Sequence, residues 1–359
     1  MTSLSSQRSG TSRTPFAARF ESIGAVVPDK RLATKDLMAR VKTRVPVDLE
    51  KLTGIREHRV CGPGEDSYTL SLAAARECLQ HSAHEAADLE MIICCSISKF
   101  KDGLNFVYEP PLALYVRDAL GAGKALAFDI ANACAGMLTG VYVMTDFIRR
   151  GVIKRGMVIS GEFITSISDN AVPRVKSVLS HELPSLSLGD CGAAVIVERS
   201  DTGSGALTAS GFTTLARWSD LCIGKACTEA PGGEMKTDGR RIHQAAIAAS
   251  PPILERALRE WGYSYDEVDY FIPHQTSTTA ITTGIRRTKK RLRGTPRNVV
   301  VNLEEYGNTA STSHFLAMYR LLVERRFKRG DKIFLGALAS GLVIGGVMFT
   351  MDDLVERYG

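Results

Sequence analysis

The alternation of short apolar runs with longer amphipathic segments is the main pattern along this chain. Runs rich in Val, Ile, Ala and Phe predict strands, and segments with an apolar residue every three or four positions predict helices between them. This order is typical of an α/β fold. We expect a first series of strands at Ala18–Val26, Met91–Cys95, Ala125–Ile130, Met157–Gly161 and Ala193–Glu198. A second series follows at Gly205–Gly211, Val268–Ile272, Val299–Leu303, Lys332–Ala337 and Val347–Met351.

Three segments carry the apolar stripe of a helix. The first stripe runs from Met137 to Ile148 and ends before Gly151, which suits a helix stop. The others lie in Thr312–Phe327 and Ile253–Trp261. Because both strand series show the same order of elements, we predict two related halves, joined near residues 200–205 where Asp, Thr, Gly and Ser cluster.

The composition is ordinary for a soluble globular protein, with 44% hydrophobic residues, 23% charged residues and a net charge of +6. This mild charge can attract an acidic partner but gives no argument for nucleic acid, and no nucleic-acid motif occurs. No apolar run is long enough for a membrane helix, and residues 1–15 predict a disordered tail rather than a secretory signal. The eight cysteines form no CxxC pair, which favours free thiols in a reducing cytoplasm.

Candidate chemistry lies at three junctions between a predicted strand and a predicted helix. Cys134 follows a run of small residues there, where the helix dipole would favour its thiolate form and the neighbours leave room for a substrate. His274 and Asn308 follow two later strands. Singly, each residue is as readily structural, as a buried thiol, an isolated imidazole or a turn Asn. Because α/β folds bind ligands at the C-terminal ends of strands, the three together predict an active site.

The ACAG, IPHQ and YGNTAS segments around these residues, in this order and spacing, resemble the Cys-His-Asn set of β-ketoacyl-ACP synthase III enzymes. Further segments are similar to the TGIRER run, the GDGAGA turn and the C-terminal glycine loop of that family, at Leu52–Arg59, Leu188–Ala194 and Ala339–Gly346. The resemblance covers residues 18–352. It implies a thiolase fold with two pseudo-symmetric βαβαβ-type halves in α-β-α-β-α layers, here residues 16–200 and 201–359.

The same resemblance implies a mechanism. Cys134 attacks an acyl thioester and carries the acyl group, while the backbone N–H groups of Cys134 and Gly341 form the oxyanion hole. A second thioester then enters, and His274 and Asn308 donate hydrogen bonds to its carbonyl oxygen as enolate character develops. The carbanion attacks the acyl-Cys in a Claisen condensation that needs no metal or other cofactor. The implied protein is a homodimeric ketosynthase that uses acyl carrier protein or acyl-CoA thioesters.

Two departures from the family pattern bear on the substrates. Synthases that prime fatty acid synthesis carry a Trp and an Arg that clamp coenzyme A, and Val47–Leu52 contains neither. We therefore expect a specialised pathway to polyketide-like or fatty-acid-derived products. Glu109 is the second departure. Some relatives that condense without decarboxylation use a Glu in this neighbourhood to remove an α-proton. By its position in the family, the Glu109 segment would approach the active site, with a path across a dimer interface as one possibility. As a base it would need a pKa raised by burial; otherwise it is a carboxylate before a helix.

A basic run follows the His274 segment and contains Arg286, Arg287, Lys289 and Lys290. We interpret it as a docking surface for an acidic carrier protein or a phosphopantetheine phosphate, with a solvated helix face as the alternative. Two other functions stay open here. One is an acyltransferase of the same fold that passes the acyl group to a hydroxyl or an amine. The other is a non-enzymatic partner subunit, against which the retention of Cys134, His274 and Asn308 argues.

Overall fold

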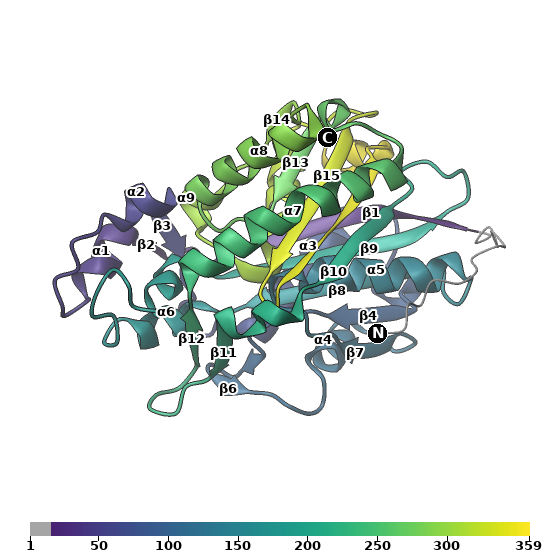
Figure 1. Cartoon of the computed structure of the whole chain (residues 1–359). Helices are drawn as coiled ribbons and strands as arrows, with labels where there is room; N and C mark the ends of the chain where they lie inside the picture. Colours follow the sequence, from purple (N-terminus) through teal and green to yellow (C-terminus); the bar gives the residue numbers. More distant parts are fainter. Residues whose placement is uncertain (1–15) are drawn as a thin grey trace, which may run out of the picture.

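Two five-stranded mixed sheets form the centre of the protein (Figure 1), seen in a computed structural model that describes residues 16–359. The tail predicted at residues 1–15 therefore lies outside the described residues. The first sheet has the order β1-β9-β8-β4-β7, formed by β1 (Ala17–Val26), β4 (Met91–Cys94), β7 (Leu126–Asp129), β8 (Arg155–Glu162) and β9 (Cys191–Ser200). The second has the order β10-β16-β15-β13-β14, formed by β10 (Thr208–Thr214), β13 (Tyr270–Pro273), β14 (Asn298–Val299), β15 (Lys332–Ala339) and β16 (Val343–Thr350).

The two sheets have the same topology. In the first, β9 pairs antiparallel with β1 and β8, and β4 pairs parallel with β8 and β7. In the second, β16 pairs antiparallel with β10 and β15, and β13 pairs parallel with β15 and β14. The described strands of the first sheet come from residues 17–200 and those of the second from 208–350. The division of the chain into two halves at residues 200/201 stays a prediction.

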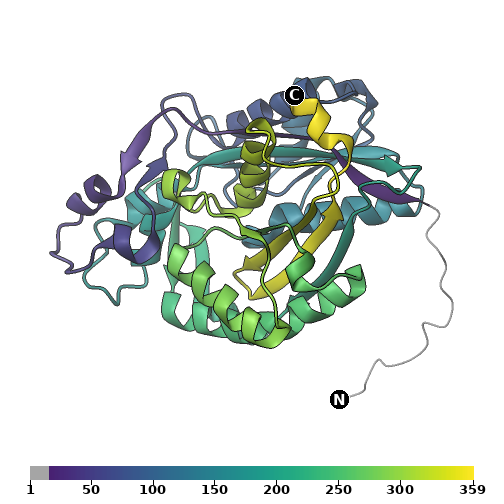
Figure 2. The same ribbon diagram turned by 90° about the horizontal axis from the view of Figure 1, so that it is seen from above.

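Helices cover both outer faces of the sheets and fill the space between them (Figure 2). The α-helices are α1 (Thr34–Ala39), α2 (Leu49–Thr53), α3 (Ser67–Gln80), α4 (Leu112–Leu120), α5 (Gly136–Arg149), α6 (Thr165–Ala171), α7 (Gly239–Trp261), α8 (Thr278–Leu292), α9 (Leu303–Tyr306) and α10 (Ser313–Val323). Short 3₁₀ helices occur at Ala86–Asp88, Ala133–Ala135 (η2), Leu183–Ser187, Ala216–Leu221, Tyr265–Glu267, Ala310–Thr312 (η6) and Asp353–Tyr358.

The alternation of side chains along β9 separates two cores. Val195 and Val197 join α5 and α10 in the core between the sheets, whereas Ala194 and Ile196 face α3 and α4 on the outer side. This follows from the two-residue period of a strand. A third core lies between the second sheet and α7, with α8 packed against its edge. The layers are therefore helix, sheet, helix, sheet and helix, as expected.

Each predicted strand has a counterpart, but several predicted elements have different limits, among them the last strand, which begins at Val343 instead of Val347, and the two described next. Only Asn298–Val299 of the fourth strand in the second series is β-structure, because the chain enters α9 at Leu303. The helix expected at Ile253–Trp261 begins at Gly239, with the Asp238 side chain as its cap. A proline pair lies inside this helix, at the point where the sequence suggested a start.

Three short ribbons project from the sheets, and residues of the second and third line the cavity described below. They pair β2 (Arg31–Ala33) with β3 (Glu57–Arg59), β5 (Phe100–Lys101) with β6 (Asn105–Phe106), and β11 (Cys222–Ala226) with β12 (Gly233–Thr237). None of the helices that the structure describes combines the length and apolar character needed to span a bilayer.

Candidate active site

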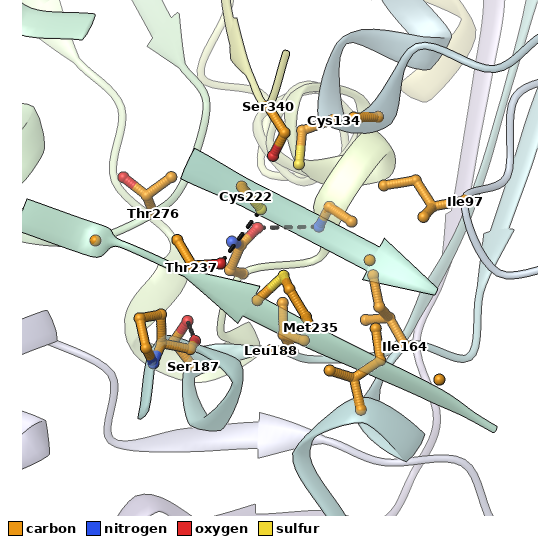
Figure 3. A pocket seen from close by; sticks show the side chains of 18 of the residues that line it. Ile97, Cys134, Ile164, Ser187, Leu188, Cys222, Met235, Thr237, Thr276 and Ser340 are labelled. Carbon is orange, nitrogen blue, oxygen red and sulfur yellow. Dashed lines mark hydrogen bonds between the residues drawn. The ribbon is translucent and has the colours of Figure 1, made fainter. Parts of the chain in front are cut away.

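A cavity of about 1660 Å³ lies where the two halves of the fold meet, and Cys134, His274 and Asn308 all line it. Cys134 belongs to the first half and the other two to the second. Figure 3 shows Cys134 beside Ser340 at one side of this cavity, together with the labelled apolar side chains of its wall. Much of the lining is apolar, so the cavity suits a ligand with an apolar body and a polar reacting end.

Cys134 lies in η2, between β7 and α5, and its side chain is partly exposed to the cavity. Small residues are required around it, because a Cβ added to Gly136 would lie 2.8 Å from the carbonyl oxygen of Cys95. Burial raises the pKa of the Cys134 thiol well above its usual range, and the neighbouring Cys222 and Glu162 raise it further. The expectation that the helix dipole favours a thiolate is therefore wrong for the free protein, since desolvation outweighs it.

His274 follows β13 directly and is held at two points. Its backbone N–H donates to the carbonyl of Gly336 on β15 at 3.1 Å, and its ring Nδ1 lies 2.9 Å from the hydroxyl of Ser313. Burial lowers the pKa of His274 to about 3, with smaller contributions from His314 and His243. The imidazole is therefore neutral at physiological pH, and its Nε2 is the nitrogen that can serve the cavity.

Asn308 is fixed by backbone and side-chain contacts. Its N–H donates to the Ser187 carbonyl at 2.8 Å, and its carbonyl accepts from the N–H of Gly189 at 3.0 Å. The side-chain Oδ1 accepts from the backbone N–H of Ala310 at 3.0 Å, which orients the amide. The Nδ2 group, the donating end of the amide, is left for the cavity that Asn308 lines. Gly307 before it has a φ of 69°, a conformation that favours glycine.

Comparison with known proteins identifies the family. The family model for 3-oxoacyl-[acyl-carrier-protein] synthase III matches residues 128–214, and the model for the C-terminal part of the same enzymes matches residues 258–351. The chain belongs to the synthase III family of condensing enzymes. The β-ketoacyl-[acyl-carrier-protein] synthase III of Brucella canis is 25% identical over 333 residues, which cover 91% of this chain and 97% of that protein. The Brucella anthropi enzyme is 26% identical over the same length.

Solved structures of similar fold include members with two different names. The 3-oxoacyl-[acyl-carrier-protein] synthase III of Aquifex aeolicus superposes with a TM-score of 0.79 at 25% identity, covering 93% of this chain and all of that one (100%). A variant of OleA from Xanthomonas campestris gives a TM-score of 0.82 at 22% identity, covering 95% of this chain and 99% of that one. The predicted thiolase fold is confirmed by these similarities.

Other residues predicted for this synthase III-like chain lie at different distances from the cavity. Gly341, with a φ of 121°, turns the chain between β15 and β16; Ser340 and Leu342 on either side line the cavity, whereas Gly341 is outside the lining. Glu109 is exposed and also outside the lining, although Tyr108 before it belongs to the wall. Within one copy of the chain, Glu109 is therefore not part of the cavity. The roles proposed for both residues stay predictions.

The basic run lies on the exposed side of α8, one turn after residues of the same helix that line the cavity. Its members are Arg286, Arg287, Lys289 and Lys290, all exposed. Within residues 16–359, none of these four side chains forms an ion pair. Thr283 on the cavity wall precedes Arg286 and Arg287 by one turn and the two lysines by nearly two, so the free cations stand close to the rim of the site.

Sequence reasoning assigned no catalytic or positioning role to three groups at the site. Glu162 is fully buried and binds loops from both halves, Ser313 contacts the ring of His274, and Cys222 on β11 shares the cavity with Cys134. No sequence motif distinguishes any of the three, although Glu162 lies at the C-terminal end of a strand, where such residues gather. Among the residues that the structure describes, no three His, Cys, Asp or Glu side chains are grouped as a metal site requires.

Proposed function

We propose that this synthase III family member is a ketosynthase that forms a carbon–carbon bond between a Cys134-bound acyl group and a second acyl thioester. The observation that carries the proposal is the convergence of Cys134, His274 and Asn308 on one large cavity from both halves of the fold. Each side chain presents the atom that the reaction needs: a thiol, an imidazole nitrogen and an amide N–H. The names of the similar proteins favour this reaction over acyl transfer to a hydroxyl or an amine.

The reaction divides into two thioester steps. Cys134 Sγ forms a bond to the acyl carbon, the substrate's C–S bond breaks, and the leaving thiol takes up the proton that Cys134 lost. The N–H groups of Cys134 and Gly341 are proposed to stabilise the oxyanion of this step. Neutral His274 and Asn308 then donate hydrogen bonds to the carbonyl oxygen of the second thioester. The carbanion formed there attacks the acyl carbon and the bond from that carbon to Cys134 Sγ breaks. The leaving thiolate takes up one proton, from solvent after loss of CO₂ or from the base that removed the α-proton.

The second substrate decides what generates the carbanion. Loss of CO₂ from a malonyl-type thioester needs no base, whereas condensation of two simple acyl chains requires removal of an α-proton. Glu109 is our candidate for that base in the second case. Because it is exposed and outside the cavity of its own chain, this role requires a homodimer in which Glu109 reaches the partner's cavity. A specialised pathway rather than acetyl-CoA priming remains our expectation.

The experiment that tests the function is intact-protein mass spectrometry after incubation with acyl thioesters of several chain lengths. We expect an acyl adduct on the wild type and on Cys222→Ala, which removes another thiol that lines this cavity, but none on Cys134→Ala. Addition of a malonyl or acyl thioester should then discharge the adduct into a longer β-keto product. Discharge only onto alcohols or amines would favour the acyltransferase, and failure of every thioester to form an adduct would refute the proposal.

The carrier-docking role of the basic run has its own test. Charge reversal at Arg286 and Arg287 should raise KM for a carrier-protein thioester and leave kcat nearly unchanged, because these side chains lie outside the cavity. A truncated thioester without phosphate serves as the control substrate. Equal KM values for wild type and variant with the carrier-bound substrate would show that this face of α8 is only a solvated surface.

A further inference from the structure

Within residues 16–359, the ring of His274 has one hydrogen-bond partner, the hydroxyl of Ser313. Ser313 Oγ lies 2.9 Å from His274 Nδ1, and both residues are buried, at 1% and 5% exposure. Ser313 is the first residue of α10, and His274 follows β13, so the contact joins the middle helical layer to the second sheet. The geometry holds the ring with Nε2 away from Ser313.

The adjacent His314 provides an internal comparison. Its ring lies 6.0 Å from the His274 ring, between centroids, and its Nε2 is 2.9 Å from the carbonyl oxygen of Gly336. A carbonyl can only accept a hydrogen bond, so neutral His314 must carry its proton on Nε2. A hydroxyl both donates and accepts, and the contact with Ser313 therefore fits either neutral form of His274.

We propose that Ser313 is the positioning residue that lets His274 work in both of its neutral tautomers, one for each half of the reaction. This inference rests on the proposed ketosynthase function. In acylation, Nε2 must accept a proton. In condensation, Nε2 must donate a hydrogen bond. A fixed acceptor at Nδ1 would favour the first form throughout, and a fixed donor would favour the second.

The proton positions can be followed through both steps. In acylation, Nδ1–H donates to Ser313 Oγ, and the Nε2 lone pair takes the proton from the thiol of Cys134. As the new S–C bond forms and the substrate's C–S bond breaks, the leaving thiolate takes that proton from Nε2. For condensation, one proton leaves Nδ1 and one arrives at Nε2, exchanged through water in the cavity. Nδ1 then accepts from the rotated hydroxyl, and Nε2–H donates to the thioester carbonyl.

The burial of His274 favours this scheme over a permanently charged ring. Burial lowers its pKa to about 3, so the imidazolium that forms during acylation is short-lived and the neutral forms prevail. Within residues 16–359 no carboxylate forms a hydrogen bond or an ion pair with this ring, and its partner Ser313 is neutral as well. A neutral partner stabilises both tautomers similarly, whereas a carboxylate would bind the proton on Nδ1.

The test is ¹⁵N NMR of histidine-labelled protein, with the His274 signals assigned by comparison with His274→Gln. Wild type should show His274 in both tautomers, with ring shifts between the limiting values, while His314 shows the Nε2–H form alone. Ser313→Ala should move His274 to a single tautomer, and Ser313→Thr should restore the mixture. Thr312→Ser is the matched control: Thr312 lies next in the chain and its buried hydroxyl bonds to Thr309 instead, so His274 should be unchanged.

Kinetics connect the tautomer to function. Ser313→Ala should slow adduct formation and adduct discharge by about tenfold each, the effect of losing one buried hydrogen bond, and Ser313→Thr should recover most of both rates. A single His274 tautomer in the wild type, unchanged in Ser313→Ala, would overturn the proposal. If the wild type formed no adduct, the ketosynthase function would fail, while the NMR comparison of the free proteins would still decide the role of Ser313.

Discussion

Replacement of Glu162 perturbs a buried carboxylate that joins the two halves beside the active site. Glu162 is fully buried and accepts hydrogen bonds from the backbone N–H groups of Ile97 at 3.0 Å and Ser98 at 3.1 Å. The hydroxyls of Ser98, Ser160 and Ser311 complete the set. Ile97 and Ser98 line the cavity, and Ser311 belongs to the turn after Asn308, so the carboxylate fixes both loops.

The magnitude follows from the geometry of Glu162→Gln. Oε1 faces the N–H of Ile97 and Oε2 faces that of Ser98, so either orientation of the new amide sets its NH₂ group against a backbone donor. Burial raises the pKa of Glu162, but even a protonated carboxyl oxygen keeps a lone pair for the N–H, whereas an amide NH₂ has none. One unsatisfied buried donor lowers the free energy of unfolding by about 1–3 kcal/mol. Glu162→Ala leaves both donors unsatisfied, so we expect roughly twice that loss.

The assay is urea unfolding followed by circular dichroism, with the free energy taken from the linear extrapolation. Glu260→Gln, the same change at an exposed position on α7, is the matched control and should stay within about 0.5 kcal/mol of wild type. Adduct formation at Cys134 should also slow in Glu162→Gln, because the loop at Ile97 loses its anchor. A Glu162→Gln protein as stable as the Glu260→Gln control would refute this reasoning.

Three further predictions follow from the site and its supports. The rate of acylation should stay level from pH 7 to pH 5, because His274 with a pKa of about 3 remains neutral, while an ordinary histidine would be only about 3% neutral at pH 5; a fall centred near pH 6.5 would contradict this. The lowered pKa also means that His274 contributes stability above its unfolded pKa of about 6.5, and that this contribution is lost as pH falls towards 3. Between pH 6 and 4, the free energy of unfolding of His274→Gln should therefore change with pH by about 1.4 kcal/mol per unit less than that of the wild type. An unchanged slope would refute this prediction. Gly307→Ala should slow adduct discharge about tenfold while adducts still form, since its Cβ would lie 2.8 Å from His58 Nδ1 and shift Asn308; discharge at the wild-type rate would contradict it.

The strands and helices that the sequence predicted best are those whose pattern is set by burial alone. Met91–Cys94 is apolar at every position because both faces of β4 are covered, and its predicted limits are wrong by one residue. The start of α7 was missed because Pro251 and Pro252 suggest a boundary, yet the helix continues through them. The apolar run after Val299 has the composition of a strand, but the chain must turn into α9 there to bring Asn308 to the cavity.

The residues of the candidate site also fall into those that the sequence could predict and those that it could not. Cys134, His274 and Asn308 could be predicted because all three lie at the C-terminal ends of predicted strands and occur together in one family pattern. The partners that orient them could not, since these contacts join distant positions: Glu162 and Ser311 are 149 residues apart, and Ser313 is 39 residues from His274. A serine or a buried glutamate carries no local signal of such a contact.

The charge state of the free site follows from a competition at Cys134 between burial and the end of α5. Burial prevails, so the thiol keeps its proton, and the same burial keeps His274 neutral. A thiolate–imidazolium pair in this apolar cavity would lose several kcal/mol of hydration per ion when an acyl chain displaced the water. A neutral pair avoids that loss, and charge develops only when a thioester carbonyl is in place to receive it. The neutrality of the resting site is therefore what allows a largely apolar cavity to hold both the acyl chain and the nucleophile.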